Sequence, residues 1–190
     1  MSHFDKITDL PILDLYTELT KMLSDGIVDF SSFNQISLNT LPSHPDDFKK
    51  GTGSLQYDWN NSKEVINIDG TSSVIPTEYE VPLKEEDFSV LCTQFKGTLF
   101  EEAYNELSKR YKLGRVRLMK MGLRYCMSWH TDSSPRLHFP IKTQTGCFMI
   151  IENEIKHIPR YEWWMADTTK SHTALNASND ERIHLVVAIL

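Results

Sequence analysis

Several features that define other protein classes are missing from this chain of 190 residues. No stretch approaches the ~20 consecutive apolar residues that a membrane-spanning helix needs. The first residues, Met1 to Lys6, lack the basic and then apolar run of a signal peptide. Internal repeats, low-complexity tracts and linkers are also absent. We therefore expect one cytoplasmic domain spanning residues 1–190, without membrane association.

Cysteine is scarce, and positive charge is in deficit. The three cysteines, Cys92, Cys126 and Cys147, are an odd number at unrelated spacings, so no disulfide framework or zinc motif is predicted. We expect each to be a small buried apolar residue. The formal net charge of −6 and the pI of about 5.6 predict no general attraction to nucleic acids. The expected partner is a small-molecule or peptide substrate, and no pattern indicates an oligomeric state.

Two helices are predicted in the first part of the chain. Leu10 to Gly26 shows the three-and-four spacing of an amphipathic helix, with Pro11 in its first turn and Gly26 at its end. A capping box predicts the start of a second helix: Thr98 accepts from the first turn's N–H groups and Glu101 reaches back. We expect this helix to run to Gly114 and to pack against a sheet.

The segments between these helices are less regular. Residues 27–82 contain short alternating pieces and many turn residues, which predict strands and loops. Gln56, Tyr57 and Trp59 lie there and are candidate substrate contacts, with packing in the core as the alternative. Residues 83–95 fit a helix only in part. The whole of residues 1–114 is expected to support the rest of the domain.

From Arg115 onward the apolar pattern has a period of two. Short strands at intervals of about ten residues, preceded by helices, are typical of a double-stranded β-helix, the jelly-roll or cupin-like barrel. The predicted class is therefore mainly β with flanking helices, with a jelly-roll core over residues 115–190. The predicted strands are Val116–Met121, Tyr125–His130, Arg136–Lys142, Cys147–Glu152, Glu154–Ile158, Tyr161–Ala166, His172–Asn176 and Arg182–Leu190.

A His-x-Asp motif and a later histidine predict a metal site in this core. His130 and Asp132 lie one residue apart at the end of a predicted strand, so both side chains can point to the same side. His172, forty residues beyond Asp132, would complete the ligand set from a later strand. Two imidazoles and one carboxylate form the facial triad of non-haem Fe(II) oxygenases. The motif alone is a weak signal, and its conjunction with the jelly-roll pattern carries the prediction.

Basic residues near the triad predict how a keto-acid co-substrate is held. Arg182 opens a very apolar last strand, where a guanidinium is costly unless it is paired, and a dicarboxylate would pair it. The alternative is an ion pair with a neighbouring Asp or Glu. Arg136 and His138 alternate on one strand and are expected to contact the other carboxylate of 2-oxoglutarate or a carboxylate of the substrate. Trp129 is a further candidate wall of the substrate pocket.

These features predict a dioxygenase that uses Fe(II), 2-oxoglutarate and O2, with ascorbate as a candidate reductant. It would hydroxylate an unactivated C–H bond, and the cofactors would carry the difficult chemistry. Two alternatives stay open. One is a cupin-like metal enzyme that uses no keto acid, and the other is a non-catalytic ligand-binding barrel.

Three stretches of the sequence resemble a known family. The segments Trp129–Ile141, Trp164–Asn176 and Arg182–Leu185 look like those of the aspartyl/asparaginyl β-hydroxylases, a family of Fe(II)- and 2-oxoglutarate-dependent oxygenases that is related to the free-proline 3-hydroxylases. The resemblance covers roughly residues 115–190. It implies a jelly-roll fold and hydroxylation of an amino acid or a peptidyl residue.

The resemblance also implies residue roles. His130 and His172 match the family's iron-binding histidines, and Arg136, His138 and Arg182 match its 2-oxoglutarate contacts. One position departs from part of the family: animal members look to have no carboxylate where this chain has Asp132. That departure draws the likeness toward the bacterial amino-acid hydroxylases and away from a folded extracellular substrate.

Overall fold

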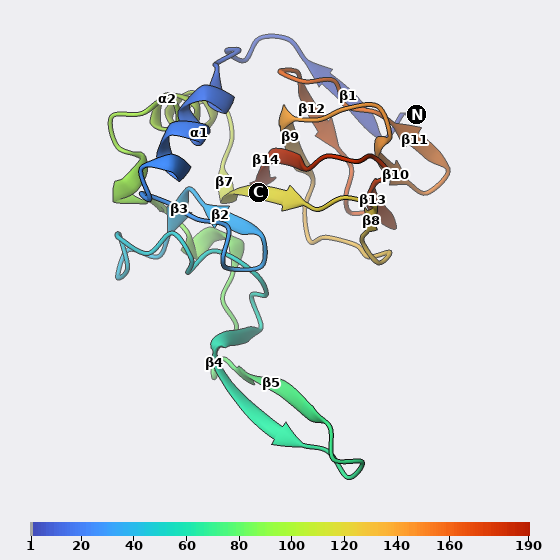
Figure 1. The fold of residues 1–190 in the computed structure, drawn as a ribbon. Helices are drawn as coiled ribbons and strands as arrows, with labels where there is room; N and C mark the ends of the chain where they lie inside the picture. Colours follow the sequence, from blue (N-terminus) through green and yellow to red (C-terminus); the bar gives the residue numbers. More distant parts are fainter. Residues whose placement is uncertain (1) are drawn as a thin grey trace.

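Two antiparallel sheets form the body of the protein. The computed structural model describes residues 2–190, apart from the side chains of Trp59 and Asn60. The larger sheet has the strand order β1-β12-β9-β14-β7-β2, and the smaller one has the order β11-β10-β13-β8 (Figure 1). The protein is thus mainly β with flanking helices, and the predicted jelly-roll class is confirmed. The larger sheet contains β1 (Phe4–Ile7), β2 (Gln35–Ser37), β7 (Leu113–Met121), β9 (Arg136–Lys142), β12 (Trp163–Ala166) and β14 (Arg182–Ile189), and the smaller contains β8 (Tyr125–Cys126), β10 (Cys147–Ile151), β11 (Glu154–Lys156) and β13 (His172–Asn176).

The segment between the helices adds smaller elements. A hairpin of β4 (Tyr57–Ile66) and β5 (Ser72–Glu78) extends away from the two sheets (Figure 1). The ambiguous residues 83–95 form short pieces rather than one helix: η1, β6 and η2. Strand β3 (Asn39–Thr40) pairs with β6 (Val90–Leu91), and the 3-10 helices are η1 (Glu85–Asp87) and η2 (Thr93–Phe95). Within the described residues, no helix has the length and apolar character needed to cross a membrane.

Helix α1 (Leu15–Ser24) is shorter than predicted. Asp14 is its N-cap, because its side chain accepts a hydrogen bond from the Thr17 backbone N–H. The prediction that Pro11 lies in the first turn is therefore wrong, since the helix begins after it. Gly26 lies just beyond the helix with a φ of 68°, a left-handed conformation that favours glycine at a helix end.

Helix α2 (Leu99–Ser108) begins where the capping residue predicted. Thr98 accepts from the Phe100 N–H, whereas Glu101 reaches the N–H of Gly97 rather than that of Thr98. The predicted end at Gly114 is wrong, because Gly114 lies inside β7. A β-carbon at Gly114 would come within 2.8 Å of Glu85 Cβ, so this glycine permits close packing instead of ending a helix.

Alternation along the central strands β7, β9 and β14 separates the apolar core from a polar face. One set of side chains packs with α1 and α2, which cover that face of the larger sheet (Figure 1). The other set faces the smaller sheet and carries most of the charged residues that concern function. The core set includes Val116, Leu118, Leu137, Phe139, Leu185 and Val187; the opposite set includes Arg115, Arg117, Arg136, His138, Arg182 and His184.

Strand pairing places the polar set in rows across the sheet. Arg117 on β7 lies opposite Val186 on β14, and Val186 in turn lies opposite His138 on β9. Arg182 lies opposite Met121, four residues farther along β14. At a rise of about 3.3 Å per residue, the row that contains Arg117 and the row that contains Arg182 are about 13 Å apart along β14.

The strand predictions after residue 115 have counterparts in β7 to β14. The bounds of β9 and β13 are as predicted, and those of β14 differ by one residue. The largest difference is the predicted strand Tyr125–His130, of which β8 keeps two residues. His130 instead forms an isolated β-bridge with His172, so the chain has left the ladder before it reaches the metal motif.

Candidate metal centre

The backbone brings His130 and His172 face to face. The N–H of His130 donates to the carbonyl of His172 at 3.0 Å, and the N–H of His172 donates to the carbonyl of His130 at 2.9 Å. Directly opposite residues in an antiparallel pair project their side chains to the same side of the sheet. The two imidazole ring centroids are accordingly 4.2 Å apart.

Both imidazole rings are oriented by backbone carbonyls. Nδ1 of His130 lies 2.8 Å from the Ser128 carbonyl, and Nδ1 of His172 lies 3.0 Å from the Lys170 carbonyl. A carbonyl only accepts, so the proton of each neutral ring belongs on Nδ1 and the lone pair on Nε2. Burial lowers the pKa of His172 below its ordinary value, which also favours the neutral ring. Each histidine therefore has the lone pair of Nε2 available for a metal ion, together with the outer hydrogen bond that metal-bound histidines usually have.

Asp132 supplies the carboxylate of the cluster. Its Oδ2 lies 3.7 Å from His172 Nε2, and its backbone N–H donates to the Thr168 carbonyl at 2.8 Å. One ligand atom from each of His130, Asp132 and His172 lies within 4.8 Å of the other two. The structure thus brings the three predicted ligands together at one point, where a single cation could contact all of them.

Arg136 fixes the orientation of Asp132. Its Nε donates to Asp132 Oδ2 at 3.2 Å, its Nη1 to Ser134 Oγ at 3.0 Å and its Nη2 to Glu85 Oε1 at 3.0 Å. Only 4% of Arg136 is exposed, so these contacts are largely shielded from water. A planar guanidinium can hold several acceptors in one arrangement, which a lysine cannot.

Glu85 is the other buried carboxylate of this region. It accepts from Arg115 Nε and Nη2 at 3.1 Å each, and also from the backbone N–H of Arg115 at 2.9 Å. Burial raises the pKa of Glu85, but the hydrogen bond from Arg115 and the positive charges of Arg115, Arg136 and Arg117 outweigh it, and the pKa falls to about 2. Glu85 is therefore ionised at neutral pH and neutralises part of a dense group of guanidinium charges.

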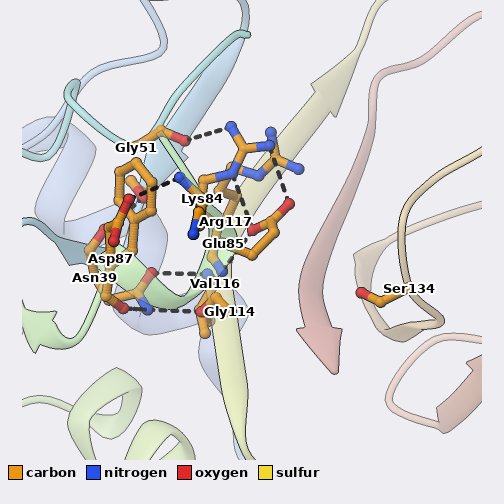
Figure 2. Close-up of polar contacts among 12 residues, drawn as sticks. Asn39, Gly51, Lys84, Glu85, Asp87, Gly114, Val116, Arg117 and Ser134 are labelled. Atoms are coloured by element: carbon orange, nitrogen blue, oxygen red, sulfur yellow. Dashed lines mark hydrogen bonds and ion pairs between the residues drawn. The ribbon is translucent and has the colours of Figure 1, made fainter. Parts of the chain in front are cut away.

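The start of β7 is fastened from both sides (Figure 2). The Asn39 side chain donates to the carbonyl of Gly114 at 2.8 Å and accepts from the N–H of Val116 at 2.8 Å, while Glu85 accepts from the N–H between them. These bonds satisfy backbone groups that the neighbouring strand does not reach. They hold the register of Arg115 and Arg117 relative to the cavity.

A cavity of about 560 Å³ lies between the two sheets, next to the metal cluster. Its wall joins the three candidate metal ligands, charged side chains of the larger sheet and several methionines. A concave pocket in which apolar side chains and several convergent polar groups meet is typical of a ligand-binding site. The lining residues include His130, Asp132, His172, Arg115, Arg117, Arg136, His138, Arg182, Met119, Met121, Met127 and Met149.

Arg182 has no carboxylate partner among the described residues, although it is only 6% exposed. The neighbouring acidic residues are engaged elsewhere: Asp180 with Lys142 at 2.7 Å and Glu181 with Lys120 at 3.4 Å. Arg182 Nη2 donates to His184 Nδ1 at 3.1 Å. Burial lowers the pKa of Arg182 to about 10, so the side chain stays cationic at neutral pH.

His138 also has unused hydrogen-bonding capacity. Neither ring nitrogen has a partner within the described structure, and the residue is 6% exposed at the cavity wall. Burial, followed by the nearby charge of Arg182, lowers its pKa to about 3, so the ring is neutral. Buried polar groups are nearly always satisfied in native proteins, and an orphaned ring facing a cavity points to a ligand.

The predicted substrate contacts are placed differently. Trp129 is 54% exposed, and neither it nor Tyr57 is among the residues that line the cavity. Gln56 is exposed at the base of the β4–β5 hairpin and donates to Glu78. Trp59 lies on β4, and its side chain is outside the described part of the structure. The roles of these aromatic residues stay predictions.

The structure adds site residues that the sequence interpretation missed. Glu85 lies in a segment whose pattern was ambiguous, and Arg115 lies in β7 before the predicted start of the strand. Arg117 and Gln35 also contact the cavity. One signal was present: Arg115 and Arg117 are two residues apart, so an inward-facing strand places both on the cavity side. The cysteine prediction is wrong at one position, since Cys126 is exposed while the other two are buried.

Comparison with known proteins places the chain in a family. No curated protein sequence matches it. Among solved structures, it is similar to AerE from Microcystis aeruginosa (20% identity, 40% of this chain and 35% of that one, TM-score 0.35), so it spans about a third of AerE's length. It is also similar to an oxidoreductase of the 2OG-Fe(II) oxygenase family from Burkholderia pseudomallei (8% identity, 98% and 83%, TM-score 0.46) and to AviO1 from Streptomyces viridochromogenes (12% identity, 97% and 87%, TM-score 0.45). The sequence profile described as aspartyl/asparaginyl beta-hydroxylase matches residues 78–190, more than half of the chain. This confirms the resemblance seen in the sequence, and the protein belongs to the aspartyl/asparaginyl β-hydroxylase family.

Proposed function

We propose that the protein is an Fe(II)- and 2-oxoglutarate-dependent dioxygenase that hydroxylates an unactivated C–H bond of an amino acid or a peptidyl residue. One observation carries the proposal: two imidazole Nε2 atoms and a carboxylate converge beside a cavity that also holds a buried guanidinium without a carboxylate partner. Family membership supports the same reaction class.

The donor set fits Fe(II). Neutral imidazole nitrogens and a carboxylate oxygen on one side of a cation, with open positions opposite, suit the facial triad of non-haem iron oxygenases. His130 and His172 would each bind through Nε2, because Nδ1 is engaged by a carbonyl. Asp132 would bind through a carboxylate oxygen whose position Arg136 holds.

The wall of the cavity fits 2-oxoglutarate. This co-substrate has two carboxylates: one, with the adjacent keto oxygen, would lie beside the His130–Asp132–His172 cluster, and Arg182 is available for the other. A carboxylate would supply the ion pair that the buried Arg182 lacks. His138, neutral and with both ring nitrogens unpartnered, would donate a further hydrogen bond on the same face.

Arg136 has a different role in this proposal from the one predicted from the sequence. Its guanidinium is already bound by Asp132, Ser134 and Glu85, so it acts as a positioning residue for the metal carboxylate. Arg182 and His138 then serve the co-substrate, and the methionine side chains exclude water from the rest of the cavity. When bound, Fe(II) and 2-oxoglutarate together supply the oxygen activation that no protein side chain can provide.

The test is anaerobic addition of Fe(II) and then 2-oxoglutarate to the metal-free protein. The expected result is the visible metal-to-ligand charge-transfer band of the chelate, with a loss in His172→Ala because a metal ligand is missing. Arg182→Ala should raise the 2-oxoglutarate concentration needed for the band without weakening metal binding. Arg160→Ala is the matched control, because Arg160 is exposed and contacts Tyr16 and Tyr161 on the surface.

Two results would contradict the proposal. Iron binding without any band in the wild-type protein would indicate a metal enzyme that does not use a keto acid. Undiminished succinate formation from 2-oxoglutarate in His172→Ala would remove this residue from the metal site. Circular dichroism of each variant checks that the fold is retained.

A further inference from the structure

The opening of the cavity beside the candidate metal cluster is apolar, whereas its interior contains buried polar and charged side chains. Arg182 and His138, which line the interior, are each 6% exposed. Phe33 is 45% exposed, Leu123 53% and Tyr125 56%, so these three lining residues mark where the cavity meets the solvent. Large apolar side chains therefore face water at the entrance to a polar site.

We call Phe33, Leu123 and Tyr125 the apolar rim. Single exposed apolar residues are ordinary on a protein surface, but a group of them at one cavity is typical of a binding site. Asparagine is the one other side chain at the opening within the described structure. The exposed residues that line the cavity are Phe33, Asn34, Gly122, Leu123 and Tyr125.

The rim is assembled from separate parts of the chain. Phe33 precedes β2, Leu123 lies between β7 and β8, and Tyr125 begins β8. In the described structure β8 is the last strand of the smaller sheet, so no further strand pairs with its outer edge. A local run of apolar residues does not explain the rim, because its members meet only in the folded protein.

Phe33 is held in a backbone conformation that a bulky side chain disfavours. Its φ is 53°, and that of Asn34 is also 53°. The N–H of Gln35 donates to the carbonyl of Ser32 at 2.8 Å, so Phe33 and Asn34 are the two central residues of a tight turn. Turns with positive φ at both central positions prefer Asn-Gly, and a bulky residue there is an outlier. The turn alone would favour asparagine or glycine at position 33, and such outliers cluster at functional sites.

The surrounding structure fixes the Phe33 ring at the opening. The N–H of Lys120 on β7 donates to the carbonyl of Asn34 at 2.8 Å, which ties the turn to the larger sheet. The ring lies against the backbone of Gly53, where a β-carbon would come within 2.8 Å of Phe33 Cε2. Gly53 is itself fixed, since its carbonyl accepts from Arg115 Nη1 at 2.8 Å. A ring that is already in place loses little freedom when a ligand packs against it.

We propose that the apolar rim binds a large apolar group of the substrate outside the cavity, with Phe33 as the specificity-determining residue. The rim is continuous with the cavity, so a substrate that reaches the metal cluster with one part places a neighbouring part against the rim. The proposal rests on the function proposed above and names a substrate class: molecules with an aliphatic or aromatic group beside the position that reacts. That group has two sources, a neighbouring residue of a peptide or an acyl chain on a single amino acid.

The experiment compares the wild type with Phe33→Asn, Phe33→Leu and Ile155→Asn. Asparagine suits the backbone of the turn and removes the ring, whereas leucine keeps an apolar group at the same position. Ile155→Asn is the matched control, because Ile155 is 64% exposed on β11, at the opposite edge of the smaller sheet from β8, and does not line the cavity.

Two sets of probes separate the sources of the apolar group. One set contains end-capped tripeptides with a central aspartate or asparagine between two glycines, two leucines or two phenylalanines. The other contains aspartate and asparagine with an N-acetyl, N-butanoyl or N-hexanoyl group. The readouts are the perturbation of the Fe(II)–2-oxoglutarate band without oxygen, and KM and kcat for succinate formation with oxygen.

The wild type should need about 10- to 100-fold less of a probe with a large apolar group than of its glycine or N-acetyl counterpart, as burial of one large apolar side chain implies. A preference in the peptide set alone identifies a neighbouring residue, one in the acyl set alone identifies an attached chain, and one in both shows that the rim accepts either. Phe33→Asn should lose most of the preference through KM, with kcat and 2-oxoglutarate binding unchanged. Phe33→Leu should keep part of it and Ile155→Asn all of it. Phe33→Asn should unfold at a urea concentration no lower than that of the wild type.

Several outcomes would overturn the proposal. They are a wild type that responds equally to large and small probes or to no probe, a preference that survives in Phe33→Asn, and an equal loss in Ile155→Asn. A urea midpoint of Phe33→Asn well below that of the wild type would show that the ring serves the fold and not the substrate. Loss of 2-oxoglutarate binding in Phe33→Asn would assign the ring to the co-substrate instead. A wild-type protein that forms no Fe(II)–2-oxoglutarate band would contradict the proposed function itself, which keeps the two failures distinguishable.

Discussion

Glu85 packs directly over Gly114, so closely that a β-carbon on Gly114 would lie 2.8 Å from Glu85 Cβ and 3.1 Å from its Oε2. The first strand residue after the glycine is Arg115, which binds the same carboxylate through its backbone and its side chain. The ion pair that organises the polar face of the sheet therefore depends on the absence of a side chain at one position. A side chain at position 114 would occupy the space that the Glu85 side chain needs in order to bind Arg115.

Gly114→Ala should destabilise the protein by about 1–3 kcal/mol or more, because the new methyl group overpacks a buried site. Equilibrium urea unfolding measures the change. Gly122→Ala is the matched control, since a β-carbon there meets nothing within 4 Å and the change is expected within about 0.5 kcal/mol. Equal stability of the two variants would contradict the close packing of Glu85.

Glu85→Gln should make the free energy of unfolding less dependent on pH in the acidic range. The pKa of Glu85 is depressed from 4.5 to about 2 in the folded protein, so its ionised form contributes stability above pH 4.5 that is lost as the pH falls toward 2. A pKa shift of this size corresponds to about 3 kcal/mol in the free energy of unfolding. Because Glu85→Gln leaves the partner arginines without a carboxylate, we expect the variant to lose about 3–5 kcal/mol of that free energy at neutral pH.

The difference in the free energy of unfolding between wild type and Glu85→Gln should therefore become smaller as the pH falls from 4.5 to 2. Denaturant unfolding at a series of pH values follows it, with Glu86→Gln at the exposed neighbouring position as control. A gap that stays constant across this range would show that the carboxylate does not titrate as the ion pairs require.

Cys126 should be the one thiol that reacts rapidly in the native protein. It is exposed, whereas Cys92 and Cys147 are buried. Burial, together with the negative charge of Asp47, raises the pKa of Cys92 to about 12 and suppresses its reactive thiolate. A chromogenic disulfide reagent should titrate one equivalent in buffer and all three in denaturant, and Cys126→Ser should abolish the fast phase. Fast reaction of two thiols would contradict the burial pattern.

Much of the candidate metal site could be predicted from the sequence because it depends on local geometry. Residues separated by two positions share a side in extended chain, which correctly grouped His130 with Asp132 and placed Arg182 and Arg136 on the polar face. The strands themselves follow from alternation of apolar and polar residues. No local rule, however, states that His130 pairs with His172 through an isolated bridge.

The rest of the site depends on contacts between distant segments. Glu85 reaches Arg115 and Arg136 across 30 and 51 residues of chain, and a pattern of neighbouring residues contains no information about such pairs. Gly114 illustrates the same limit. Glycine both ends helices and permits close approach, and only the presence of Glu85 decides between the two. Arg117 was also missed as a site residue, although its spacing of two residues from Arg115 was a signal that both side chains face the cavity.

Arg136→Lys should weaken metal binding without removing any metal ligand. Lysine keeps the positive charge but cannot hold Asp132, Ser134 and Glu85 at once, so the Asp132 carboxylate loses its fixed orientation. Loss of an outer-sphere partner typically reduces metal affinity by about 10- to 100-fold. Calorimetric titration with Mn(II), which resists oxidation, measures the Kd of wild type, Arg136→Lys and the surface control Arg160→Lys. An unchanged Mn(II) Kd in Arg136→Lys would show that Asp132 keeps its orientation without the arginine. Weaker Mn(II) binding together with an intact far-ultraviolet circular dichroism spectrum would show that Arg136 positions the carboxylate and is not needed for folding.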